Sequence, residues 1–157
     1  MDSYDRERAV AYALRWALDR NPAFYDYEKL GGDCTNFISQ VLLSGGAPMD
    51  YKETFGWYYL NANRKSPSWT AVEPLYRYLM QSKKKGLFAV PAAKESVVPG
   101  DLIQLSFDGA TFRHTTVITE KREGELYVCA HSFDSKNRAI SSYPYKNLRF
   151  LHIKVEK

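Results

Sequence analysis

The stretch Gly31-Gly32-Asp33-Cys34-Thr35-Asn36-Phe37-Ile38-Ser39-Gln40 decides how this chain folds. Its two glycines precede Asp33, a residue type favoured just before a helix because its carboxylate can accept unpaired backbone N–H groups. The apolar residues that follow recur at helical spacing and stop at Gly45-Gly46. The stretch therefore predicts a tight loop that leads into a helix, with Cys34 in its first turn.

Cys34 is a candidate nucleophile in this position. The positive end of a helix dipole favours a thiolate over a thiol, and the two glycines let a substrate backbone pass close to the sulfur. Free cysteine is also among the residue types most often buried, so a structural role fits the local sequence equally well. The rest of the chain has to separate these two interpretations.

Length and charge set limits on the class of protein. The 157 residues fit one domain, 1–157, with a substantial core, and the formal net charge is +4. The basic residues are scattered apart from Lys83-Lys84-Lys85, which we expect in a solvated loop, so nucleic acid is not an expected partner. No apolar stretch is long enough to span a membrane.

The first residues and the cysteines bear on the compartment. The charged start, Met1 to Arg6, does not resemble a signal peptide, so we expect either a cytoplasmic protein or an exported domain taken from a longer chain. Cys34 and Cys129 are the two cysteines, and they permit one disulfide without requiring it.

Hydrophobic periodicity changes from helical to alternating along the chain. We expect helices at residues 5–19, after Cys34, and from Thr70, where Thr70 and Glu73 form a capping box. Strands are expected at residues 102–107, 112–119, 126–133 and 148–155. Helices followed by an antiparallel meander predict an α+β fold, with the helices packed on one face of the sheet.

Residues 50–69 are rich in aromatic side chains and follow neither a helical nor a strand period. A connection of this length is uncommon unless it is functional or folds over the core. We expect Trp57 and Trp69 to wall a substrate groove, and a packed flap is the alternative.

Two histidines fall in the predicted strands. Alternation gives His114 and His131 each a defined face, and neighbouring strands could carry both on the surface that meets the Cys34 helix. His114 would then accept the thiol proton, and His131 would orient the His114 ring, a role for which Asp134 is a rival. The backbone N–H of Cys34, Asp33 beside it, and Tyr25 or Tyr27 are candidates for the oxyanion site or the cleft.

Other interpretations of these residues remain open. His114 and His131 could be structural histidines of a sheet, and His152 is given only that role. Cys34, His114, His131 and Cys129 have the residue types of a zinc site, but no pair has the short spacing usual for zinc ligands. We therefore expect no metal and no cofactor.

Several segments carry a family resemblance. In chain order they are Tyr4-Asp5-Arg6, Ala9-Val10-Ala11-Tyr12-Ala13, Asn21-Pro22, Gly32-Asp33-Cys34-Thr35-Asn36-Phe37, Gly45-Gly46, Trp57-Tyr58-Tyr59, Ser68-Trp69-Thr70, Gly100-Asp101, His114-Thr115-Thr116-Val117 and Ala130-His131-Ser132-Phe133-Asp134. Together they resemble the putative amidase domain family of Gram-positive bacteria. More distantly, the Asp-Cys pair at a helix start and Pro99-Gly100-Asp101-Leu102 opening a strand look like NlpC-type and CHAP-type cell-wall peptidases.

The resemblance implies a papain-like fold and hydrolysis of amide bonds by cysteine, plausibly in peptidoglycan stem peptides. Carried over by position, Cys34 is the nucleophile, His114 the base and His131 the third polar residue, and Tyr25 or Tyr27 is the counterpart of an upstream Tyr that assists the oxyanion. The distance between the two histidines along the chain is longer than is usual in NlpC-type enzymes, so the third residue stays open between His131 and Asp134.

The sequence thus predicts a cysteine amidase or peptidase that works through a thioester and takes a peptide or peptidoglycan-like substrate. Two rivals remain. One is an acyl- or amidotransferase that uses the same residues, and the other is a module that binds peptidoglycan or a peptide without catalysis.

Overall fold

The computed structural model describes residues 1–82 and 85–157, so two lysines of the predicted solvated loop, Lys83 and Lys84, lie outside the described residues. The helices are α1 (Arg6–Trp16), α2 (Cys34–Ser44), α3 (Pro67–Thr70) and α4 (Val72–Leu79), and a 3₁₀ turn, η1, covers Ile140–Ser142. The strands are β1 (Tyr59–Asn61), β2 (Arg64–Lys65), β3 (Gly86–Pro91), β4 (Leu102–Ser106), β5 (Phe112–Arg122), β6 (Glu125–Ala130), β7 (Ser135–Ala139) and β8 (Asn147–Glu156).

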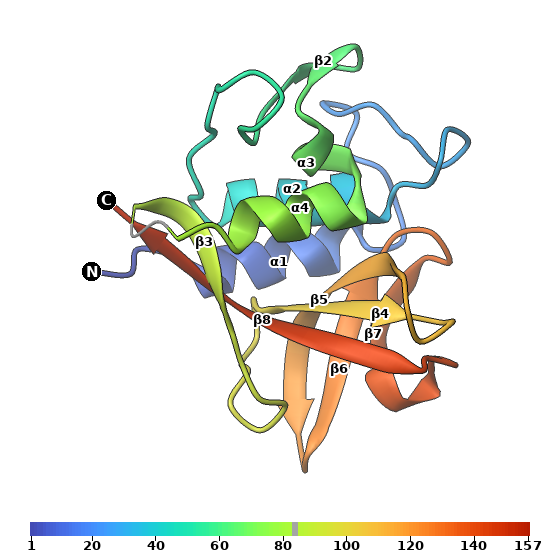
Figure 1. Ribbon diagram of the computed structural model, residues 1–157. Helices are drawn as coiled ribbons and strands as arrows, with labels where there is room; N and C mark the ends of the chain where they lie inside the picture. Colours follow the sequence, from blue (N-terminus) through green and yellow to red (C-terminus); the bar gives the residue numbers. More distant parts are fainter. Residues whose placement is uncertain (83–84) are drawn as a thin grey trace.

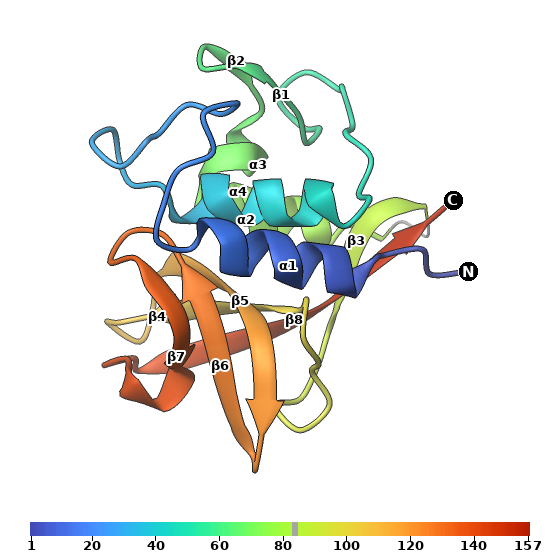
Figure 2. The same ribbon diagram turned by 180° about the vertical axis from the view of Figure 1, so that it is seen from behind.

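Six of the strands form one antiparallel sheet in the order β3-β8-β4-β5-β6-β7. The helices form a layer against it, with the β1–β2 hairpin above them (Figures 1 and 2). The predicted α+β class, with helices and an antiparallel sheet, is confirmed. The sheet is not a simple meander, because β8 lies between β3 and β4 and pairs with both.

Local sequence explains the two helices that build the site. At the start of α1 the Asp5 carboxylate accepts the backbone N–H of Arg8 at 3.0 Å, and Ala9 and Ala13 are buried on one face. Nine of the eleven residues of α2 are buried, from Cys34 to Leu42. A helix that is buried over so much of its surface needs neighbours on several sides, and α2 lies between α1, α3 and the sheet (Figure 2).

The sheet buries side chains on both faces. The helix side holds Phe37, Ile38, Leu102, Val117 and Cys129, among others. The opposite face has its own smaller core, which contains Val97, Ile103, Leu105, Ile118, Leu126, Val128, Ile140 and Tyr143. Residues of the two faces therefore alternate along β4, β5 and β6, and this alternation decides which histidine faces which core.

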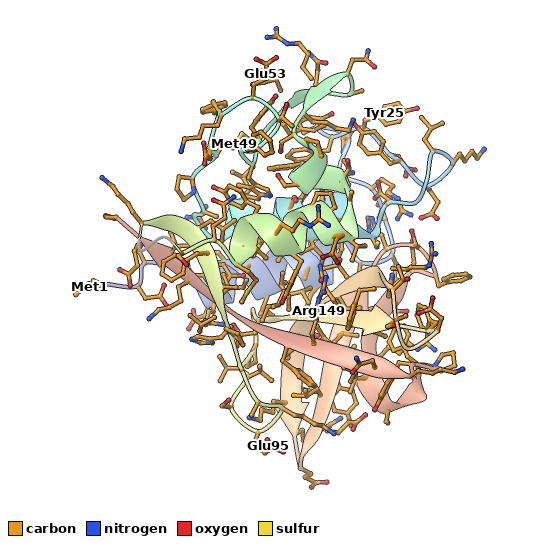
Figure 3. All side chains as sticks on the ribbon, in the orientation of Figure 1. Met1, Tyr25, Met49, Glu53, Glu95 and Arg149 are labelled. Atoms are coloured by element: carbon orange, nitrogen blue, oxygen red, sulfur yellow. The ribbon has the colours of Figure 1, made fainter. Side chains whose placement is uncertain are left out.

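The capping box predicted at Thr70 and Glu73 is wrong. Thr70 ends α3, and α4 begins after Ala71 without a side-chain cap. The Glu73 carboxylate instead pairs with Arg149 of β8 at 2.9 Å. Arg149, labelled in Figure 3, also donates to Gln104 at 2.7 Å, so the ion pair joins α4 to the sheet.

Trp57 and Trp69 belong to the core rather than to a groove wall. Both are fully buried, and their rings pack 4.8 Å apart between centroids. Each indole N–H donates to a polar side chain of α2, from Trp57 to Ser39 at 3.1 Å and from Trp69 to Asn36 at 3.0 Å. The prediction that they line the cleft is wrong, because α2 supplies both an apolar surface and acceptors for the two indoles.

Across residues 1–82 and 85–157, no helix combines the length and apolarity needed to cross a membrane.

Candidate active site

Cys34 opens α2 at the point predicted from the sequence. The loop before it needs Gly31 and Gly32, whose φ values of 94° and 103° lie in the left-handed region that favours glycine. A Cβ on Gly32 would also come within 3.2 Å of the Ser132 side chain. The Cys34 side chain is 9% exposed, so the sulfur reaches the surface through a narrow opening.

Two cavities meet at Cys34. The first, here the Glu73 cavity, has about 690 Å³ and includes Tyr27, Lys65 and Glu73 in its walls. The second, here the His114 cavity, has about 620 Å³ and includes His114, Phe133 and Tyr143. Gly31, Gly32, Cys34 and Arg113 line both. An extended ligand that lies in both cavities therefore passes over the Cys34 thiol.

The resting sulfur is a thiol rather than a thiolate. Burial raises the pKa of Cys34, and hydrogen bonds from the backbone N–H groups of Thr115 and Thr35 only partly oppose it. The helix start was expected to favour the thiolate, but the desolvation of a charged sulfur is the larger effect here. The thiol therefore needs a base that removes its proton during attack.

His114 is a neutral imidazole that lines one cavity with that thiol. It lies on β5, is 5% exposed, and its ring lies near those of Phe107 and Tyr143, with centroids 6.4 and 5.9 Å away. Burial, together with the smaller effect of the positive charge of Arg138, lowers the pKa of His114 to about 4. Its Nε2 is buried and has no hydrogen-bond partner among the described residues.

Cys34 and His114 share the His114 cavity without a direct hydrogen bond in the part of the chain that the structure describes. Strand β5 brings its backbone to the sulfur, because Thr115, next to His114 in the chain, gives its N–H to Sγ, while the His114 side chain lies on the face of the strand opposite to that of Thr115. Catalytic hydrogen bonds are often long in the free enzyme and tighten when substrate binds. Proton transfer therefore requires that substrate binding bring the two groups closer or that a water bridge them.

The structure does not join the two histidines. His131 Nδ1 lies 2.6 Å from Asp33 Oδ2, and Nε2 lies 2.8 Å from the backbone oxygen of Trp16. Its ring also stacks on Phe37 at 4.0 Å between centroids. Both ring nitrogens are thus engaged by oxygens of Asp33 and Trp16, and neither is free to orient His114.

The register of the strands explains why the two histidines do not meet. Val117 pairs with Cys129, whose face His131 continues, and this face meets the helices. His114 pairs with Leu105, which belongs to the core on the opposite face. The prediction of a common surface is wrong, because alternation fixes faces within a strand but not the register between strands.

Asp33 does not cap the helix by a side-chain bond, contrary to expectation. Its Oδ1 accepts the backbone N–H of Tyr27 at 2.8 Å and the Asn36 amide at 2.8 Å, while Oδ2 faces His131. Asp33 and His131 are both about 1% exposed. This buried pair connects α1, the loop before α2 and the turn after β6, and it fixes the residue that precedes the thiol.

The other sequence candidates have structural partners. Asp134 accepts two hydrogen bonds from Arg20, at 2.8 and 3.1 Å, so its carboxylate is held by Arg20 rather than by His114. The Tyr27 hydroxyl donates to the Ala62 carbonyl at 2.8 Å, and burial raises the pKa of Tyr27 to about 12. Tyr27 lines the Glu73 cavity, and Tyr25, which is 43% exposed, packs against its ring.

Ser132 and Phe133 are site residues that the sequence did not reveal. The predicted strand at 126–133 ends at Ala130, and both residues adopt left-handed φ values, 60° and 67°. Ser132 Oγ accepts the Asp33 N–H at 2.9 Å and donates to Glu28 at 3.2 Å. Phe133 is left 88% exposed at the wall of the His114 cavity. Strained backbone of this kind is concentrated at functional sites, and no local sequence signal marks it.

The contacts of Cys129 and His152 indicate structural roles. Both cysteines are free, and Cys129 is fully buried against Thr119. His152 binds Asp101 at 2.9 Å, a partner that the sequence did not suggest. Within the described ranges, no three His, Cys, Asp or Glu side chains converge as metal ligands.

The lowered pKa of His114 predicts how stability depends on pH. The unfolded chain takes up a proton on this residue near pH 6.5, whereas the folded protein resists protonation to about pH 4. Between these values the unfolded state binds more protons, so the free energy of unfolding falls as the pH is lowered, by up to about 3 kcal/mol. Urea denaturation between neutral pH and about pH 4 measures this fall in the free energy of unfolding. In the His114→Gln variant, the free energy of unfolding should depend less on pH. An unchanged slope in that variant would assign the effect to other groups.

Comparisons with known proteins place the chain in a family. Residues 3–153 match the family described as "Putative amidase domain". "Uncharacterized protein YhbB" of Bacillus subtilis (strain 168) is 41% identical over 140 residues, which are 86% of this chain and 43% of that protein. "Uncharacterized protein YjcM" of the same organism is 25% identical over 142 residues, which are 85% of this chain and 32% of that protein.

The chain thus spans less than half the length of these two relatives. No solved structure matches it, so the likeness to papain-like peptidases rests on the sequence motifs alone. The family description points to hydrolysis of amide bonds, and the match covers the thiol and both buried histidines. The chain belongs to the putative amidase domain family.

Proposed function

We propose that this protein is a cysteine amidase or peptidase in which Cys34 is the nucleophile and His114 the general base. One observation carries the proposal: the thiol at the start of α2 and a neutral, unpartnered imidazole line the same cavity. A base must be unprotonated at the working pH, and the lowered pKa of His114 satisfies this condition. The family description supports amide bonds as the substrate class.

The reaction begins with two neutral groups. As Cys34 Sγ attacks the amide carbonyl carbon, its proton passes to His114, and the carbonyl oxygen gains a negative charge. The C–N bond then breaks, His114 gives the proton to the leaving amine, and a thioester remains on Cys34. Water, deprotonated by His114, attacks the thioester, and the acid product leaves while the thiol recovers its proton.

The start of α2 supplies a donor for the developing oxyanion. Asp33 is engaged with Tyr27, Asn36 and His131, so its carboxylate does not occupy the N–H groups of the first turn. The N–H of Cys34 is therefore our candidate for one arm of the oxyanion hole, worth about 3 kcal/mol for a well-placed donor. Tyr27, whose hydroxyl is bound to Ala62, would serve as a wall of the cleft instead.

His131 enters the proposal as a positioning residue. It holds Asp33, the neighbour of the nucleophile, rather than the ring of His114. The rings of Phe107 and Tyr143 are left to orient His114. The proposed catalytic unit is thus a Cys–His pair with a buried His131–Asp33 pair behind it, in place of a Cys-His-His relay.

Peptidoglycan stem peptides are the substrate that we propose first. The two cavities that meet at Cys34 suit an extended chain with groups on both sides of the scissile amide. The sequence resemblance to NlpC-type and CHAP-type peptidases supports the same substrate class.

Trapping of the acyl-enzyme tests the proposal. The protein is mixed with peptidoglycan fragments or a slow peptide ester, quenched in acid, and its mass measured. We expect an acyl adduct on Cys34 that decays to free acid, and a much slower adduct in His114→Ala. Turnover with no adduct on Cys34 would contradict the cysteine mechanism. When an amine is added, formation of its amide in place of the free acid would favour the transferase alternative.

A further inference from the structure

The His114 cavity contains two arginines that form no ion pair within residues 1–82 and 85–157. Its apolar walls include Phe107, Phe133, Tyr143 and Pro144, and its charged residues are Glu28, Arg113 and Arg138. Glu28 is already bound by Arg20 at 3.2 Å and by Ser132. In the described part of the chain, neither Arg113 nor Arg138 forms an ion pair with a carboxylate.

The two arginines are placed differently. Arg138 is held in position, because it donates to Ser142 Oγ at 2.8 Å and to the Ser142 carbonyl at 3.1 Å while its guanidinium stacks on Tyr143 at 3.7 Å. Arg113 is exposed and lines both cavities beside Cys34. The charge of Arg113 acts on the exposed carboxylate of Asp108, which accepts hydrogen bonds from Ser106 and two backbone N–H groups through Oδ1 and forms no ion pair with Arg113.

The charge of one of these arginines acts on His114, the proposed base. The positive charge of Arg138 is one of the two causes that lower the pKa of His114. A guanidinium that is fixed by neutral groups, and whose field enters a largely apolar cavity, is a preorganised site for an anion. Carboxylates and guanidinium groups pair with matching planar geometry.

We infer that the His114 cavity receives a carboxylate of the substrate, carried close to the scissile amide, and that Arg113 and Arg138 are the specificity residues that bind it. This inference rests on the proposed function, because it places the carboxylate relative to Cys34. It predicts that amides with a neighbouring free carboxylate are cleaved in preference to neutral ones.

Binding of such an anion would also change the base. A carboxylate next to Arg138 offsets the positive field at His114, so the pKa of His114 rises when substrate is present. A substrate with the correct charge thereby strengthens the base that it needs.

Alkylation of Cys34 tests the inference without a known substrate. Iodoacetate carries a carboxylate and iodoacetamide does not, and both react by forming an S–C bond as iodide leaves. We expect the ratio of the iodoacetate rate to the iodoacetamide rate to be about tenfold higher at Cys34 than for a free thiol at the same pH, which corresponds to about 1.4 kcal/mol. Peptide mass spectrometry reads the label, with buried Cys129 as the internal control.

The variants identify the residues responsible. Arg113→Gln and Arg138→Gln should each lower the ratio several-fold, and Arg138→Lys should keep most of it. Arg8→Gln is the matched control, since Arg8 is exposed on α1 and lines neither cavity. N-acetylglycine should protect Cys34 better than its amide or inorganic phosphate at equal concentration.

The outcomes separate the two proposals. If Cys34 reacts with neither reagent, the thiol is not an accessible nucleophile and the proposed function fails. If Cys34 reacts with both but the ratio equals that of a free thiol, or the arginine variants leave it unchanged, the carboxylate site is overturned and the nucleophile stands. Protection by phosphate but not by N-acetylglycine would also overturn the carboxylate assignment.

Discussion

Cys34→Ala is expected to lower kcat for amide hydrolysis by at least about 10⁴-fold, because the thioester route needs the sulfur and the remaining binding groups supply only residual catalysis. The same change should lower the free energy of unfolding by no more than about 1 kcal/mol, since the side chain is small and lies at a helix start next to two cavities. The measurements are product formation from peptidoglycan fragments and urea denaturation.

Cys129→Ala is the control for that experiment. It removes the other thiol from the core, so it should reduce stability while turnover per folded molecule stays the same. If Cys34→Ala retains turnover, the nucleophile lies elsewhere. If it loses turnover because it no longer folds, the denaturation curve shows this directly. A Cys34→Ala protein that keeps its full biological effect would favour the binding-module alternative.

Asp33→Ala should have the largest effect on stability, about 3–5 kcal/mol. The change removes the two oxygens that take part in three hydrogen bonds, with Tyr27, Asn36 and His131, and it leaves His131 buried without its carboxylate. Breaking a buried pair by removing one partner is costly because the other group is left desolvated and unpaired. Urea denaturation at neutral pH measures the loss.

Asp33→Asn is the informative control for this pair. Its amide oxygen can still accept from Tyr27 and Asn36, and its NH₂ group can donate to His131 Nδ1, so we expect a loss of only about 1–2 kcal/mol. The same urea denaturation measures both variants. Equal losses in the two variants would contradict the expectation that Asp33→Asn keeps most of these hydrogen bonds.

Much of the fold could be predicted because its signals are local. The α1 and α2 helices are marked by Asp5, by the glycines before Cys34 and by apolar spacing. Strands β4, β5 and β8 follow an alternating pattern. The missed strands have weaker signals: β3 is a short apolar run that ends in Pro91, and β7 is a polar strand at an edge of the sheet.

The candidate site was harder to predict because it depends on contacts between distant segments. Cys34 and His114 could be named from residue type and position, and the structure brings both to one cavity. The partner of His131 depends on the register of β5 against β6 and on where α1 ends, and neither is encoded near His131. Trp57 and Trp69 were misplaced for a similar reason, since an aromatic residue suits a cleft or a core and only the position of α2 decides between them.

The place of β8 in the sheet has a consequence for synthesis on the ribosome. Residues 147–156 lie between β3 and β4, so these two earlier strands cannot complete the central sheet until residues 147–156 have emerged. Translation at about 5–20 residues per second leaves the backbone edges of β3 and β4 without their shared neighbour for several seconds. During that interval the nascent chain presents unpaired strands to chaperones, and we expect the Cys34 cavities to take shape only after β8 has been inserted.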